Sequence, residues 1–280
     1  MARAKTIRCG GDAGLRLWKR PHPWFQERVE MLKFKLTLAY AGGRYQGWQS
    51  RPEGTGVQDQ VEAALARLFA SAPRVESASR TDSGVHARGM VAHVEVSREQ
   101  FQMPERRLVP ALNACLPDDV RVVSAVLVPA EFHARFDATG KQYRYHVWNH
   151  AVMDPLSREC RWHVPQPLDL AAMREAVSHL TGTHDFRAFT AKRDGVLGDS
   201  VRTLTRCSVV KRREELTFVI EGTGFLYKMC RGIVGTLVQV GQGKFAPQEV
   251  LEMLASQDRR EAGVNAPAHG LVLWQVFYPK

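Results

Sequence analysis

Alternating apolar and polar residues predict most of the strands in this chain. Between Lys33 and Tyr40 every second residue is large and apolar and the intervening residues are mostly polar, which is typical of a strand with one buried face. The same pattern or a continuous apolar run predicts seven further strands, at 75–79, 90–96, 120–127, 141–149, 202–211, 215–222 and 271–278.

Helical spacing of apolar residues predicts four helices, near 57–69, 169–182, 227–240 and 248–254. Strands outnumber helices and neighbouring strands resemble hairpins, so the fold class is α+β with largely antiparallel, mixed sheets. The strand–helix–strand order occurs on both sides of residue 150. We therefore expect two related α/β lobes, 31–150 and 151–280, with an active-site cleft between them.

The loop Ser79–Ala87 connects two predicted strands and carries an acidic residue, Asp82, with Arg80 two positions before it. Gly84 permits turn conformations that other residues avoid, and the hydroxyls on either side of Asp82 can bond nearby amides. Such a loop presents Asp82 outward. The same residues also suit an ordinary Asx turn, in which Asp82 only accepts amide hydrogen bonds.

A cation interrupts the apolar pattern of the helix that begins near Tyr227. Arg231 falls on an apolar stripe of this helix, and removing the partner of a buried charge costs about 3–5 kcal/mol, so Arg231 requires an anion. It reaches solvent or a structural carboxylate in one interpretation and pairs with Asp82 in the other. An ion pair between Arg231 and Asp82 would keep the Asp82 carboxylate ionised, as a nucleophile or base requires.

Composition points to an anionic partner. The 280 residues carry a formal net charge of +10, which favours nucleic acid first and an anionic membrane surface second. Residues 1–30 hold seven basic residues against three acidic ones, and Met31 opens the first strand. We therefore expect a basic, poorly ordered extension over 1–30. No apolar run approaches the roughly 18 residues of a membrane span.

Motifs for bound cofactors are missing from the sequence. The histidines lack metal-ligand spacing, and Gly241-Gln242-Gly243-Lys244 lacks the spacing of a phosphate-binding loop. We expect neither a metal nor an organic cofactor. The five cysteines are widely spaced without a C-x-x-C pair, which fits reduced thiols in the cytoplasm. Arginines, aromatics and one exposed Asp together favour a protein that binds structured RNA or single-stranded nucleic acid and has a carboxylate available for chemistry, without defining the reaction.

Several blocks, in order along the chain, resemble the tRNA pseudouridine synthase A family. The block Arg80-Thr81-Asp82-Ser83-Gly84-Val85-His86-Ala87 is similar to the family's R-T-D-x-G-V-H-A signature. Further similar blocks are Tyr45–Gln49 (Y-x-G-W-Q), Phe132–Phe136 (F-H-A-R-F), Lys141–Tyr145, Phe225–Gly235 (F-x-x-x-M-x-R-x-x-V-G) and Ala266–Leu271 (A-P-A-x-G-L). The resemblance extends from Met31 to the end of the chain.

This resemblance implies an enzyme that converts uridines on the 3′ side of the tRNA anticodon stem and loop to pseudouridine, without a cofactor. It implies that Asp82 is the nucleophile, Tyr143 stacks on the target base, Arg80 assists base flipping and Arg231 pairs with Asp82. It further implies a basic cleft between the lobes, and a homodimer. From their basic, aromatic and amide character, we expect further RNA contacts from Arg44, Gln46, Trp48, His86 and Arg135.

The sequence departs from the family pattern after the first strand, where Ala41-Gly42-Gly43 replaces the usual D-G-T, and at two positions near these residues. Ser79 stands where the family usually has Gly, and Gly232 stands where it usually has Asn, which costs its helix about 1 kcal/mol relative to Ala. None of these departures removes a proposed catalytic group. Two alternatives stay open at this point: a non-catalytic tRNA-binding or folding protein, and a synthase that acts on another RNA or on other tRNA positions.

Overall fold

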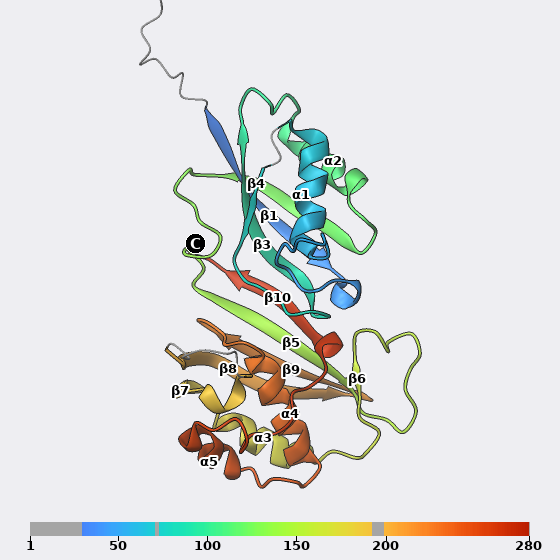
Figure 1. The fold of residues 1–280 in the computed structure, drawn as a ribbon. Helices are drawn as coiled ribbons and strands as arrows, with labels where there is room; N and C mark the ends of the chain where they lie inside the picture. Colours follow the sequence, from blue (N-terminus) through green and yellow to red (C-terminus); the bar gives the residue numbers. More distant parts are fainter. Residues whose placement is uncertain (1–29, 71–72, 192–198, 280) are drawn as a thin grey trace, which may run out of the picture.

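The computed structural model describes residues 30–70, 73–191 and 199–279, and in them one ten-stranded sheet runs through both halves of the chain (Figure 1). Residues 1–29 of the predicted extension lie outside the described part. The strand order is β4-β1-β3-β10-β5-β9-β8-β7, with β2 beside β3 and β6 beside β5. The strands are β1 Met31–Tyr40, β2 Val75–Ser77, β3 His86–Ser97, β4 Val120–Val128, β5 Gly140–Trp148, β6 Trp162–His163, β7 Gly182–Asp185, β8 Val201–Arg212, β9 Glu215–Gly222 and β10 Leu271–Phe277.

Most strand pairs in the described residues are antiparallel, and the parallel pairs are β3–β10 and β5–β6. The α+β class with a largely antiparallel sheet is therefore confirmed. The last strand, β10, lies between β3 of the first half and β5. It therefore joins the halves into a single continuous sheet.

Five α-helices of the described residues cover the sheet in two groups (Figure 1). They are α1 Val57–Leu68, α2 Leu108–Cys115, α3 Leu170–Ser178, α4 Met229–Gly241 and α5 Glu249–Ser256. Helices α1 and α2 lie beside β4, β1 and β3, whereas α3, α4 and α5 lie beside the strands of the second half. The sequence did not predict α2, an eight-residue helix with Pro110 in its first turn, where proline is tolerated.

Close packing explains the glycine in the middle of α4. A Cβ at Gly232 would lie 2.5 Å from the carbonyl oxygen of Phe189. Close approach of the Phe189 backbone therefore offsets the lower helix propensity of glycine. The helix is buried over almost its whole length, so Arg231, in its first turn, has a fixed position. Among the described residues, no helix is long and apolar enough to cross a membrane.

Candidate active site

The loop that carries Asp82 joins β2 to β3 and is held by the segment 45–49. The Trp48 amide donates to the carbonyl of Thr81 at 3.1 Å, and the Gly84 amide donates to the carbonyl of Tyr45 at 3.3 Å. Gly47 has a φ of +90°, and a Cβ there would lie 2.5 Å from the oxygen of Thr81. Only glycine permits this approach without strain, so the two loops are fixed against each other.

The hydroxyls beside Asp82 do hold the loop, but their partners differ from the expectation. The Thr81 hydroxyl lies 2.8 Å from the Tyr40 hydroxyl of β1, and the Ser83 hydroxyl donates to the carbonyl of Tyr45 at 3.3 Å. The predicted partners were nearby amides. Both hydroxyls bond to segments that are distant in the sequence, and the residues next to Asp82 alone do not predict such partners.

Asp82 and Arg231 lie together although 149 positions separate them in the sequence. An oxygen of the Asp82 carboxylate is 3.9 Å from Nη1 of Arg231, and the two side chains are 23% and 15% exposed. The Nε of Arg231 donates to the Ala266 carbonyl at 2.6 Å, which fixes the guanidinium. An opposite charge at this distance favours the ionised carboxylate.

A cavity of about 770 Å³ opens in front of Asp82. Asp82, Arg80 and Tyr143 all line it, as do Phe225 and Leu226 from the segment before α4. Such a volume is within the usual range of small-molecule and cofactor sites. The part of the cavity around Asp82 therefore combines a carboxylate, the cation of Arg80 and aromatic rings.

Tyr143 of β5 is buried at the wall of this cavity. Its ring meets the Phe225 ring edge-on at a centroid distance of 5.0 Å, and its hydroxyl is 3.2 Å from the Ser79 hydroxyl. Burial raises the pKa of Tyr143, as do the nearby Cys230 and Asp82. The phenol is therefore neutral near pH 7. Ser79, the departure from the family pattern, supplies its hydrogen-bonding partner.

Cations predominate along the cavity wall. Six basic residues line it against the two carboxylates of Glu76 and Asp82, and they are Arg51, Arg74, Arg80, Arg135, Lys141 and Lys228. Burial, followed by the nearby Arg135, lowers the pKa of Lys141. The sequence did not single out Lys141 as a site residue, because a lysine at the start of a strand gives no signal. This charge balance suits a polyanion.

The other predicted RNA contacts divide into two groups. Gln46, Trp48 and Arg135 line the cavity, whereas Arg44 is exposed outside the cavity lining and lies 3.3 Å from the carboxylate of Asp119. His86 accepts a hydrogen bond from the Gly42 amide at 3.0 Å and is also outside the cavity lining. These positions give Arg44 and His86 structural partners.

Trp48 belongs to the hydrophobic core. It is 1% exposed, and its ring centroid lies 6.0 Å from that of Tyr40. A tryptophan in a loop between basic and amide residues suggested RNA contact, yet its packing in the core accounts for its presence. Trp48 also lines the cavity, so its contact with RNA stays a prediction.

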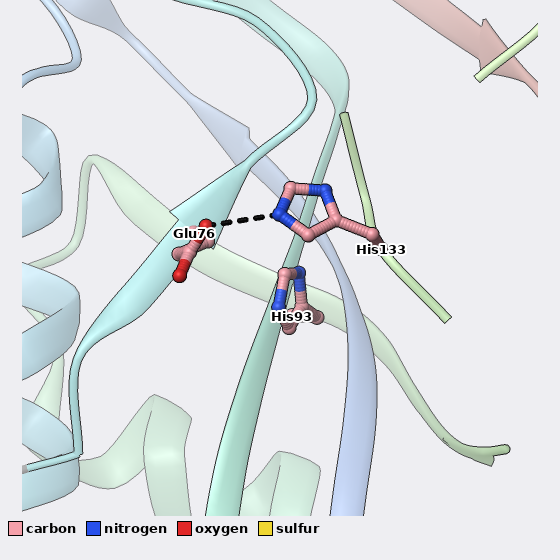
Figure 2. Close-up of side chains that lie close together, drawn as sticks. All are labelled: Glu76, His93 and His133. Atoms are coloured by element: carbon pink, nitrogen blue, oxygen red, sulfur yellow. Dashed lines mark hydrogen bonds and ion pairs between the residues drawn. The ribbon is translucent and has the colours of Figure 1, made fainter. Parts of the chain in front are cut away.

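Three residues distant in sequence, Glu76, His93 and His133, form the one group in the described part of the chain with ligand atoms close enough for a metal ion (Figure 2). These atoms all lie within 4.8 Å of one another. Ligand spacing along the sequence cannot reveal such a group, because each residue comes from a different segment. Glu76 and His133 also line the cavity.

The chain is similar over most of its length to proteins of one kind. A family model described as tRNA pseudouridine synthase matches residues 37–137 and 176–279. The tRNA pseudouridine synthase A of Myxococcus xanthus is 46% identical over 249 residues, which cover 89% of this chain and 92% of that protein. The protein of the same name from Bacillus subtilis is 43% identical over 249 residues, 88% of this chain and 99% of that protein. Another, from an Exiguobacterium species, is 42% identical over 250 residues, 89% of this chain and 99% of that protein.

Proposed function

This chain belongs to the tRNA pseudouridine synthase family, and from that premise we propose that Asp82 is the catalytic residue with which it isomerises uridine in tRNA. The enzyme is an isomerase that acts on tRNA. The observation that supports the role of Asp82 is its position at the cavity beside Arg231 and Tyr143. We assign its targets to the 3′ side of the anticodon stem and loop, in keeping with the family resemblance of the sequence motifs.

The reaction requires no net oxidation or reduction. The bond between N1 of uracil and C1′ of ribose breaks, a bond between C5 and C1′ forms, C5 loses its proton and N1 gains one. An ionised carboxylate can begin this exchange by attacking the base or the ribose, or by promoting a glycal route. All three routes use Asp82, and Arg231 at 3.9 Å stabilises its negative charge.

Tyr143 and Arg80 act on the uracil in this proposal. The buried ring of Tyr143 offers a flat wall for the base, and its neutral hydroxyl can receive the proton from C5 while it passes its own proton to the Ser79 hydroxyl at 3.2 Å. Arg80 is exposed on the Asp82 loop, where it can take the place of an extruded base. Extrusion costs a few kcal/mol, and stacking of about 1–3 kcal/mol per base helps to offset it.

Assembly and location are further parts of the proposal. We assign a homodimer, in keeping with the family resemblance; β4 lies at an edge of the sheet and exposes Val123 and Val126, an apolar surface that a second copy can cover. Light scattering that finds a monomer at micromolar concentration would contradict it. A cytoplasmic location suits the free cysteines of the described residues, which are Cys115, Cys160, Cys207 and Cys230.

Mapping of pseudouridine on bulk tRNA after incubation with the purified protein tests the reaction and its position. We expect new pseudouridine on the 3′ side of the anticodon stem and loop. Product at other tRNA positions would overturn the positional assignment while leaving the reaction intact. Absence of product from tRNA that the protein binds would leave the tRNA-binding interpretation.

A further inference from the structure

A loop at the mouth of the cavity, Ala130–Asp137, which we call the rim loop, presents one unusual side chain. Phe136 is 74% exposed, and it is the only aromatic among the large hydrophobic side chains that are exposed in the described part of the chain. Phe136 and its neighbours His133 and Arg135 line the cavity. Singly exposed apolar residues are common on protein surfaces, but Phe136 lies among the basic side chains of the cavity lining, where an exposed ring can stack on a base.

The rim loop is fixed to the sheet by hydrogen bonds to its backbone. The Nζ of Lys33, on β1, donates to the carbonyls of Ala130 and Phe132, the second at 3.1 Å. The Ala134 amide donates to Nδ1 of His93, on β3, at 3.2 Å. The Ala134 carbonyl in turn accepts a bond from the Tyr278 hydroxyl at 2.6 Å. Residues 130–134 are therefore held by side chains of β1 and β3 and by Tyr278, which follows β10.

His133 holds the part of the loop that carries Phe136. Its Nδ1 accepts hydrogen bonds from the Arg135 and Phe136 amides at 3.2 and 3.3 Å, and its Nε2 lies 3.0 Å from the Glu76 carboxylate of β2. Figure 2 shows Glu76, His93 and His133 converging from three segments of the chain. Glu76 thus anchors the imidazole, and the imidazole fixes the backbone at Phe136.

These bonds argue against a metal ion in the cluster. An amide N–H can donate only to an unprotonated nitrogen, so Nδ1 is unprotonated in both His93 and His133, and their neutral forms carry the proton on Nε2. A metal would need that Nε2 unprotonated, and both rings would then lose their bonds to the rim loop. Burial also lowers the pKa of His93, with contributions from His133 and Lys33, which keeps it neutral.

The outer side chains of the rim loop form a continuous surface of rings and charge. The ring centroids of His133 and Phe136 are 4.2 Å apart with planes at 33°, and the Arg135 guanidinium lies 5.8 Å from the centroid of Phe136. An exposed ring beside a guanidinium is the arrangement on which unpaired bases stack, while the cation contacts phosphate. Double-stranded RNA offers no such unstacked base.

We propose that Phe136 stacks on an unpaired nucleotide of the tRNA at the mouth of the cavity while Arg135 contacts phosphate, and that Glu76 and His133 are positioning residues for this contact. The proposal rests on tRNA as the substrate. It adds to the reaction at Asp82 a second base contact at the mouth of the cavity, made by a side chain that takes no part in the chemistry. Phe136 thereby favours tRNAs that have an unpaired base close to the target uridine.

Phe136→Ala and Phe136→Trp test the stacking contact. Loss of a base stack is expected to weaken tRNA binding about tenfold and raise KM by a similar factor, while kcat stays within about twofold. Phe136→Trp retains the stack and should restore the affinity of the wild type. Leu251→Ala on α5, which removes another exposed apolar side chain, is the matched control with unchanged binding. Equal affinity of Phe136→Ala and wild type would overturn the proposal.

A test of the positioning role of Glu76 requires single and double variants. Glu76→Ala should weaken binding about threefold with little loss of thermal stability, because its side chain is 61% exposed. In the Phe136→Ala background it should have no further effect, and Glu76→Gln, which can still accept the Nε2 proton, should restore affinity. Independent effects that multiply in the double variant would refute positioning. One equivalent of Zn²⁺ that binds wild type and not Glu76→Ala would also refute it.

Binding and turnover separate this proposal from the proposed function. All affinities are measured in the Asp82→Asn background as well, so that product formation does not enter. If wild type binds tRNA and forms no pseudouridine, the proposed function fails while the stacking contact is still judged by affinity. If wild type is active and Phe136→Ala has the wild-type KM, only the stacking contact fails.

Discussion

The pair formed by Arg231 and Asp82 permits a quantitative prediction. Two unit charges 3.9 Å apart interact by about 4 kcal/mol at an effective dielectric constant of 20. The side chains are 15% and 23% exposed, so solvent screening reduces this figure. Replacement by a side chain of similar length, Arg231→Met, also removes the donor to the Ala266 carbonyl. We expect a loss of about 2–3 kcal/mol in the free energy of unfolding.

A double-mutant cycle in urea with Arg231→Met and Asp82→Asn measures the coupling directly. Because Asp82→Asn removes the charge that Arg231 faces, Arg231→Met should cost about 1–2 kcal/mol less in that background. Single-turnover pseudouridine formation by Arg231→Met should fall by more than tenfold, since the carboxylate loses its counterion. Arg206→Met, whose partner Glu221 lies 3.5 Å away with Arg206 54% exposed, is the control and should cost less than about 1 kcal/mol. Additive effects of the two substitutions, within about 0.5 kcal/mol, would refute the coupling.

Other predictions concern the loop, the pocket and the acid sensitivity of the fold. Gly47→Ala should destabilise the protein by about 1–3 kcal/mol and slow turnover, because a Cβ there meets the Thr81 oxygen at 2.5 Å; an unchanged melting temperature would contradict the contact. Tyr143→Phe keeps the ring, so tRNA affinity should persist while kcat falls about 100-fold; wild-type kcat would exclude the hydroxyl from proton transfer. Burial lowers the pKa of His93 and His146. In the unfolded chain these histidines have an ordinary pKa of about 6.5, so as the pH falls they bind protons there before they do so in the folded protein. Protonation therefore favours the unfolded state, and the free energy of unfolding should decline from pH 7.5 to 5.5. A melting temperature that stays constant over this range would contradict it.

Local patterns predicted the central strands well because burial of one strand face imposes alternation directly on the sequence. Strand β1 follows its predicted range closely, and β3 begins earlier than predicted because its first residues run past a bulge. The short strand β7 and the helix α2 were missed, since four or eight residues are too few to display a period.

The sequence predicted those parts of the candidate site whose residue types are unusual for their local environment. A cation on an apolar helix stripe indicated that Arg231 needs a partner, which left solvent or a structural carboxylate as one interpretation and Asp82 as the other, and the family resemblance favoured Asp82. The burial of Trp48 and the cluster around His133 were not predictable, because each depends on segments brought together only by the sheet. The boundary near residue 150 between the two lobes stays a prediction.

The carboxylate of Asp82 is the centre of this account, and Asp82→Asn tests it most directly. The substitution keeps the shape of the side chain and removes its charge. With tRNA and excess enzyme in a single turnover, we predict no pseudouridine formation, together with a tRNA dissociation constant within about threefold of wild type. Product formation within tenfold of the wild-type rate would contradict Asp82 as the catalytic residue and reduce it to a residue that holds the turn.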